Sequence, residues 1–159
     1  MSDPDIIKLF KTDQCSRLIR TKLKTLNVET ATIRDALNSL KERETDYVCL
    51  VDSNEQIQGL ITERSILRWA AIGELREDSL ASSIMEVDFT PIESTDSISK
   101  LVMAMYEGGK YDHMPVMEDG KLIGVVAARD FIYYLIDYYA DSVFTVLPGM
   151  SPPDTREGA

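Results

Sequence analysis

Two short stretches of the sequence carry the residues best suited to bind a ligand. They read Gly59-Leu60-Ile61-Thr62-Glu63-Arg64-Ser65 and Gly124-Val125-Val126-Ala127-Ala128-Arg129-Asp130. In each, a strand pattern passes directly into a helical pattern, so the first backbone N–H groups of the helix lack internal acceptors and lie at the positive end of the helix dipole. A phosphate placed at such a turn would meet these donors. Both turns are therefore candidate nucleotide sites.

The side chains of the two turns are only partly the same. Arg64 and Arg129 hold equivalent positions just after each helix begins, where a guanidinium can pair with phosphate oxygens. The first turn has Thr62 and Ser65, whose alternative role is a helix cap alone, worth about 1 kcal/mol. The second turn has Asp130, whose alternative role is to favour a helix N-terminus by about 0.3 to 1 kcal/mol. The threonine hydroxyl is thus present only in the first turn, and the acidic residue only in the second.

Both turns belong to a unit that occurs twice. Two sets of four apolar residues follow helical spacing, and each member of the second set lies 65 positions after its counterpart. The sets are Ile33, Ala36, Leu37 and Leu40, and Ile98, Leu101, Val102 and Met105. Capping residues precede each set, and a strand-turn-strand pattern follows it, over 48–61 in the first copy and 114–126 in the second.

This order predicts an α/β fold of the α+β type, built from two tandem β-α-β-β-α repeats. We predict an N-terminal segment with a short helix (1–21), a first repeat (22–73), a charged linker (74–83), a second repeat (84–140) and a C-terminal tail (141–159). Cys15 and Cys49 are far apart and have no neighbours at metal-ligand spacing, so we expect reduced thiols and no metal site.

The tandem units resemble the CBS domain pair, named after cystathionine β-synthase and also called a Bateman module. The likeness covers roughly residues 22 to 140 and includes the strand-Gly-apolar-apolar-Thr-x-Arg-Asp pattern of the turns. The second copy matches well, with Ile84-Met85 at its start and Asp112-His113-Met114-Pro115-Val116 before its hairpin, whereas Ser65 replaces the acid in the first. The resemblance implies a pseudo-twofold module with two clefts, each able to hold AMP, ADP, ATP, S-adenosylmethionine or a similar adenosyl compound.

In the similar family, the acid of the turn accepts hydrogen bonds from both ribose hydroxyls, and the threonine contacts ribose or phosphate. Since serine cannot replace a carboxylate in this role equally well, we expect the cleft with Asp130 to bind ribose better. His113 is expected beside the ligand, the alternative being a satisfied half-buried side chain. For strand residues near the adenine pocket, the alternative is plain strand packing. The predicted ligand-binding residues are Asp130, Arg129, Ala127, Gly124, His113, Met114, Pro115, Thr90, Ile92, Thr62, Arg64, Ser65, Val48 and Val28.

We therefore predict a regulatory module that senses an adenosyl ligand and modulates a partner protein. The alternative is a ligand-free dimerisation or protein-interaction module with degenerate clefts, which the divided motif supports. An enzyme is not expected, because the chain has one histidine, no Ser-His-Asp or Cys-His arrangement and no phosphate loop. No catalytic cofactor is implied, since the adenosyl compound would be a regulatory ligand.

Charge and apolar patterning indicate the partners. The 27 acidic and 17 basic residues give a net charge of -10, which argues against a nucleic-acid binder. No apolar run approaches the roughly 18 residues of a membrane span and no leader pattern is present, so we expect a cytoplasmic protein without membrane contact. The stretch 131–139 is apolar on nearly every side of its predicted helix. We therefore expect a homodimer through the repeat-terminal helices, the alternative being that the chain's own tail covers this helix, with the regulated effector on another chain.

Overall fold

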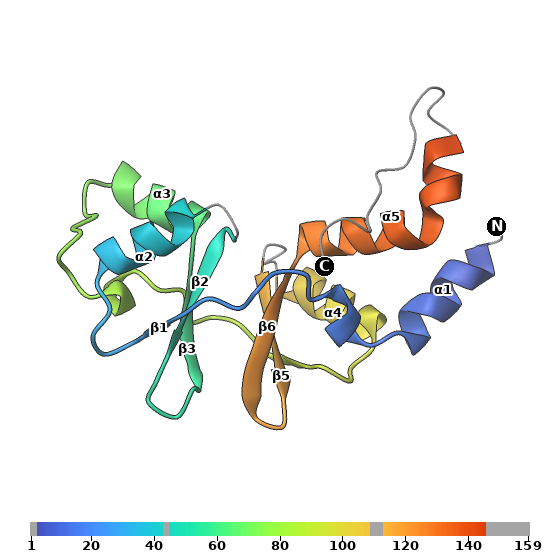
Figure 1. Cartoon of the computed structure of the whole chain (residues 1–159), viewed down its shortest axis with the longest axis horizontal. Coiled ribbons are helices and arrows are strands. Elements are labelled where there is room, and N and C mark those ends of the chain that lie inside the picture. Colours follow the sequence, from blue (N-terminus) through green and yellow to red (C-terminus); the bar gives the residue numbers. More distant parts are fainter. Residues whose placement is uncertain (1–2, 43–44, 109–112, 146–159) are drawn as a thin grey trace.

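The order of helices and strands occurs twice along the chain (Figure 1). The computed structural model describes residues 3–42, 45–108 and 113–145. After helix α1 (Asp3–Thr12) and the 3₁₀ turn η1 (Cys15–Leu18), the first unit contains β1 (Thr25–Asn27), α2 (Ile33–Lys41), β2 (Tyr47–Val51), β3 (Ile57–Thr62) and α3 (Glu63–Ala71). After the 3₁₀ turn η2 (Ala81–Ser83), the second unit contains β4 (Ile92–Glu93), α4 (Ile98–Glu107), β5 (His113–Glu118), β6 (Lys121–Ala127) and α5 (Ala128–Thr145). The two β-α-β-β-α repeats are confirmed, while the limits 22–73 and 84–140 stay a prediction.

Each unit folds around a three-stranded sheet, with strand orders β1-β2-β3 and β4-β5-β6. The first strand of each sheet is parallel to the second, which pairs antiparallel with the third. Tyr47 lies opposite Thr62 in the first sheet and His113 lies opposite Ala127 in the second, so these are equivalent positions. The sheets face each other and the helices lie on their outer sides (Figure 1). One buried cluster joins the sheets, formed by Tyr47, Cys49, Leu60, Met117, Leu122 and Val125.

Apolar spacing and capping residues explain how α2 and α4 form and pack. Their buried residues recur at the predicted helical spacing: Ile33, Ala36 and Leu40 in α2, and Ile98, Leu101 and Met105 in α4. Thr32 caps α2 and Ser97 caps α4, each accepting a hydrogen bond from the backbone N–H three residues later. Val102, which the spacing placed in the buried stripe, is instead 38% exposed, because it borders an apolar hollow between α4 and α5.

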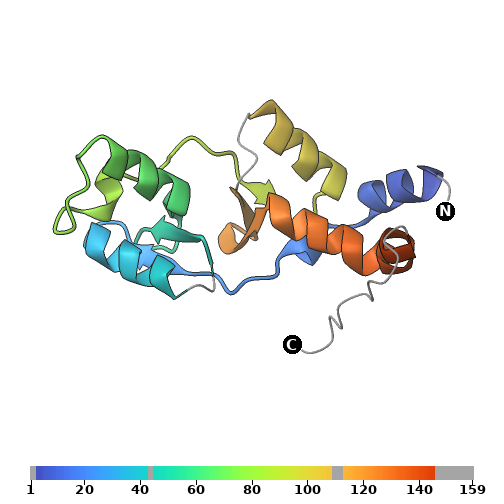
Figure 2. The same cartoon turned by 90° about the horizontal axis from the view of Figure 1, so that it is seen from above.

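The segment that precedes each unit packs against the other unit. We call residues 13–20 and 79–86 the leading segments. The backbone N–H of Cys15 donates to the carbonyl of Asp96 in the second unit, and that of Ala81 donates to the carbonyl of Ala31 in the first, both at 2.8 Å. Figure 2 shows the two connections that cross between the units. Because the same contact is made twice by equivalent residues, the units are related by a pseudo-twofold axis.

Two glycines allow the leading segments to approach the sheets closely. A methyl group on Gly124 would lie 2.7 Å from Cγ2 of Ile19 in the first leading segment. One on Gly59 would lie 2.7 Å from Cγ of Met85 in the second. Real Cβ atoms keep about 3.5 to 4.0 Å from other carbons, so both positions require glycine for this packing.

Helix α1 packs on the second unit, as expected for a short N-terminal helix. The rings of Phe10 and Phe131 lie 5.2 Å apart, and Asp13 accepts a hydrogen bond from the Tyr134 hydroxyl at 2.7 Å. Among the described residues, no helix combines the length and apolar content needed to cross a membrane. From residue 146 on, the predicted tail lies outside the described part of the chain.

Both cysteines are buried free thiols. Cys15 lies in the core of the second unit and Cys49 between the sheets. Burial raises the pKa of Cys15 to about 11 and that of Cys49 to about 12. Since the thiolate is the reactive form, both side chains act as small apolar core residues.

Candidate functional site

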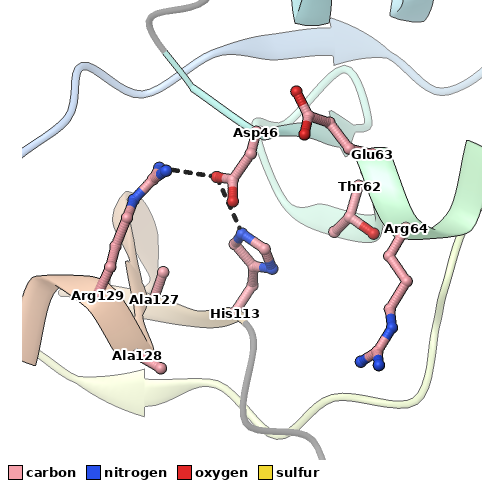
Figure 3. Close-up of a pocket in the computed structure, with 8 residues that line it drawn as sticks. All are labelled: Asp46, Thr62, Glu63, Arg64, His113, Ala127, Ala128 and Arg129. Atoms are coloured by element: carbon pink, nitrogen blue, oxygen red, sulfur yellow. Dashed lines mark hydrogen bonds and ion pairs between the residues drawn. The ribbon is translucent and has the colours of Figure 1, made fainter.

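A cavity of about 340 Å³ lies between the N-termini of α3 and α5 (Figure 3). Its lining residues come from both turns and from the starts of β2 and β5: Asp46, Thr62, Glu63, Arg64, His113, Ala127, Ala128 and Arg129. Five of them are predicted site residues, and Asp46, Glu63 and Ala128 were not predicted. The rings of the equivalent residues Tyr47 and His113 lie 5.5 Å apart, so the pseudo-twofold axis passes beside this cavity.

At the first turn, the chain itself fills the helix donors. The backbone N–H of Ser65 donates to the Thr62 hydroxyl at 3.1 Å, and that of Thr62 donates to the Ser65 hydroxyl at 2.8 Å. The N–H of Glu63, the first residue of α3, donates to the backbone carbonyl of Asp46 at 3.1 Å. Thr62 and Ser65 thus form the reciprocal helix cap that was the alternative interpretation of these residues. This turn offers few unused donors to a ligand.

The second turn lacks that arrangement. Ala127 has no hydroxyl, so it cannot cap α5 as Thr62 caps α3. Instead, one carboxylate oxygen of Asp130 accepts a hydrogen bond from the backbone N–H of Ala127 at 2.7 Å. Asp130 is buried, and burial raises the pKa of its carboxyl group. Ala128 and Arg129, the first two residues of α5, line the cavity, so the uncapped end of the helix borders it.

A carboxylate, an imidazole and a guanidinium meet on one side of the cavity. Asp46 Oδ1 lies 2.8 Å from a terminal nitrogen of Arg129 and 3.1 Å from Nε2 of His113. The close polar contact with His113, together with the charge of Arg129, lowers the pKa of Asp46 despite its partial burial. The His113 side chain is only 8% exposed, and neither ring nitrogen makes a well-aligned hydrogen bond with the described residues. The cavity therefore holds a buried imidazole with unused hydrogen-bonding capacity.

Asp46 was missed by sequence reasoning. The shift of 66 positions that aligns Cys49 with Pro115 also places Asp46 opposite Asp112, a residue of the recognised second-copy pattern. That equivalence was the available signal, although it does not indicate that Asp46 contacts Arg129, which lies in the other unit. Asp112 itself lies outside the described residues.

A second, smaller cavity of about 70 Å³ adjoins His113 from the other side. Its lining brings together three predicted residues, Thr90, His113 and Met114. The others are Asp88, Phe89, Ala104 and Gly108. His113 lines both cavities.

In the first unit, the position equivalent to Thr90 is Lys24. Leu26 pairs with Leu50 as Ile92 pairs with Val116, which sets this equivalence. The Lys24 ammonium forms an ion pair with Glu42 and donates to the carbonyl of Ser39 at 3.4 Å. The two units therefore differ at this position as well as at their turns.

The remaining predicted residues do not line either cavity, and Asp130 and Ser65, both buried behind the turns, are among them. Val48, Ile92 and Pro115 are buried in the apolar cores, and Gly124 lies against Ile19. Val28 packs partly buried against the core of the first unit. Among the described residues, no three His, Cys, Asp or Glu side chains come together in a way that could hold a metal ion.

Comparison with known proteins agrees with this architecture. The sequence matches the CBS domain over residues 15–72 and 81–137. It is 32% identical over 119 residues to the CBS domain-containing protein CBSCBSPB2 of Arabidopsis thaliana, covering 74% of this chain and 22% of that protein. The chain spans at most 65% of the length of the first curated relatives it matches.

Two solved structures have a similar fold. One is the CBS domain protein PAE2072 from Pyrobaculum aerophilum, complexed with AMP, with a TM-score of 0.68, 22% identity and coverage of 82% of this chain and 100% of that one. The other is the CBS domain pair of protein MJ0100 in complex with 5′-methylthioadenosine and S-adenosyl-L-methionine, with a TM-score of 0.69, 16% identity and coverage of 80% and 98%. With both repeats matched, the chain belongs to the CBS domain family and contains two tandem CBS domains.

Proposed function

We propose that this protein is a regulatory module that binds an adenosyl ligand, AMP, ADP, ATP or S-adenosylmethionine, and modulates a partner protein without catalysing a reaction. The observation that carries the proposal is the 340 Å³ cavity that Arg129, His113 and the start of α5 line together. Similar folds have been solved with AMP in one case and with S-adenosylmethionine and 5′-methylthioadenosine in another. That fold likeness supports the ligand class and leaves its individual member open.

We assign the ligand to the cleft of the second unit. Asp130 holds the N–H of Ala127 with one carboxylate oxygen, and we assign the other oxygen to the ribose hydroxyls. Arg129 and the start of α5 border the space that the 5′ group of the ligand would occupy. The smaller cavity beside Thr90 and Met114 would receive part of the base.

The first unit is the weaker candidate. The N–H groups of its turn already donate to Thr62, Ser65 and Asp46. Lys24, at the position equivalent to Thr90, forms an ion pair with Glu42. A ligand would have to displace these contacts before it gained its own. We therefore propose one main binding cleft for each chain.

We also propose that the protein forms a homodimer through α5, the repeat-terminal helix of the second unit, together with α4 beside it. Apolar side chains are exposed on both of these helices: Val102, Met103 and Tyr106 on α4, and Ile132, Tyr133 and Tyr138 on α5. Between the helices lies an apolar hollow of about 230 Å³, bordered by Val102, Tyr106 and Phe131. An exposed apolar surface of this kind is typical of a protein–protein contact. A second copy is the occupant we assign to it.

Thermal denaturation with a panel of AMP, ADP, ATP and S-adenosylmethionine tests the ligand proposal. A ligand at 100 times its dissociation constant stabilises the fold by about 2.7 kcal/mol, which raises the melting temperature of a chain of this size by roughly 5 to 10 °C. If no member of the panel shifts the melting temperature, the ligand-free interaction module becomes the better interpretation.

Calorimetric titration of two matched variants then tests the assignment of the cleft. Asp130→Ala is expected to weaken binding more than Ser65→Ala, although the two residues are equivalent in the repeat. Equal affinities for the wild type and Asp130→Ala would remove Asp130 from the site.

A further inference from the structure

Asp46 already contacts Arg129 and His113, the two side chains with which the second-unit cleft would bind an anion. Its Oδ1 atom is the acceptor for Arg129 at 2.8 Å and lies 3.1 Å from His113 Nε2 (Figure 3). Both groups thus point at one carboxylate oxygen rather than into the open cavity. A phosphate has the same charge preference and similar acceptor oxygens, so it would compete with Asp46 for them.

The charges of the lining residues support this competition. Two arginines, Arg64 and Arg129, are balanced by two acidic residues, Asp46 and Glu63. The pKa of Asp46 is lowered, so this side chain is ionised at neutral pH. An incoming phosphate therefore meets a carboxylate of like charge at the arginine it needs, and like charges at this range repel.

We infer that Asp46 is a specificity residue that makes the cleft favour adenosyl ligands with an uncharged 5′ group over those with a phosphate. The inference rests on the proposed function, because it assumes that an adenosyl compound enters this cleft. It differs from the pattern of the turns, since Asp46 lies in the first unit, outside both turns, and reaches Arg129 across the boundary between the units.

The backbone holds Asp46 in place independently of its carboxylate. Its carbonyl accepts the hydrogen bond from the N–H of Glu63 at 3.1 Å, and Thr45 beside it is buried, with its hydroxyl donating to the carbonyl of Tyr47 at 2.9 Å. Asp46→Asn keeps these contacts and the side-chain shape while removing the negative charge. The substitution therefore isolates the electrostatic role.

The matched control is Asp78→Asn. Asp78 also pairs with an arginine, Arg34, at 2.9 Å, but its side chain is 92% exposed and it does not line the cavity. Its substitution changes the net charge of the chain by the same amount. Asp46→Ala serves as a second variant, because it removes the acceptor altogether.

Isothermal titration calorimetry with AMP and 5′-methylthioadenosine provides the test, because these two ligands differ only in the 5′ group. Freeing a charged hydrogen-bond partner is expected to raise the affinity for AMP by about tenfold or more in Asp46→Asn and Asp46→Ala, with the affinity for 5′-methylthioadenosine unchanged. Asp78→Asn should keep the wild-type ratio of the two affinities.

The outcomes separate the inference from the function on which it rests. If both Asp46 variants bind the two ligands in the wild-type ratio, Asp46 does not select against phosphate, whereas adenosyl binding stands. If neither the wild type nor any variant binds either ligand, the proposed function fails and the specificity role fails with it.

Discussion

The contact between Gly124 and Ile19 gives a quantitative test of how the leading segments pack. A methyl group on Gly124 would lie 2.7 Å from Cγ2, 2.9 Å from Cδ1 and 3.1 Å from Cγ1 of Ile19. These distances are below the usual 3.5 to 4.0 Å, and the β-branched side chain of Ile19 has few rotamers by which to move away. Overpacking of this kind costs typically 1 to 3 kcal/mol. We expect Gly124→Ala to lower the free energy of unfolding by about 2 kcal/mol and the melting temperature by roughly 4 to 8 °C.

A double-mutant cycle shows whether Ile19 causes this loss. Ile19→Ala removes all three crowded atoms, so the methyl group of Gly124→Ala should be accommodated in the double variant. Denaturant unfolding of the four proteins is expected to give a favourable coupling of at least about 1 kcal/mol. Gly120→Ala is the control, because Gly120 has a positive φ of 76° but no atom within 4 Å of the added methyl group. Its effect should add to that of Ile19→Ala. If the losses caused by Gly124→Ala and Ile19→Ala simply add in the double variant, the packing of the first leading segment against the second unit is refuted.

Three further substitutions test the cap, the buried acid and the apolar surface. Thr62→Ala should lower the free energy of unfolding by about 1 kcal/mol by leaving the N–H of Ser65 without its acceptor, and calorimetry of Thr62→Ser should show the loss restored. Burial raises the pKa of Asp130 above its usual value of 3.8. The protonated carboxyl group therefore contributes its full stabilisation below pH 3.8, and this contribution is lost as the pH rises through the raised pKa. Asp130→Asn should therefore gain melting temperature relative to the wild type between about pH 3 and pH 7, and a difference independent of pH would contradict this. Val102→Glu places a charge on the exposed apolar surface of α4 and should shift sedimentation velocity profiles from dimer to monomer, whereas an unchanged dimer would move the interface elsewhere.

Local pattern was enough to predict the repeated unit, because its signals lie within short stretches of chain. The helical spacing of Ile33, Ala36 and Leu40 identifies the face of α2 that is buried, and the same spacing in α4 does so for Ile98. The capping residue Thr32 marks where α2 begins. Each of these features depends on neighbours three or four residues apart, which the sequence displays directly.

Contacts between distant residues could not be predicted in the same way. Nothing in the periodicity indicates that Cys15 bonds to Asp96, or that Asp46 reaches Arg129, since these pairs are joined only by the tertiary fold. Val102 was misplaced for the same reason. Spacing identifies an apolar face but not whether this chain or another molecule covers its edge.

The two turns show how duplicated elements can take on different roles. Buried donors at a helix start must find acceptors, or the fold loses about 1 to 3 kcal/mol for each one. In the first unit, Thr62, Ser65 and the carbonyl of Asp46 accept the N–H groups of Ser65, Thr62 and Glu63, so the chain itself satisfies most of that turn. In the second, position 127 has no hydroxyl, and among the described residues one carboxylate oxygen of Asp130 accepts from the N–H of Ala127. Because Ala127 cannot cap α5 as Thr62 caps α3, the two turns differ in the acceptors that the chain itself provides, and this difference is our reason for proposing one main binding cleft rather than two.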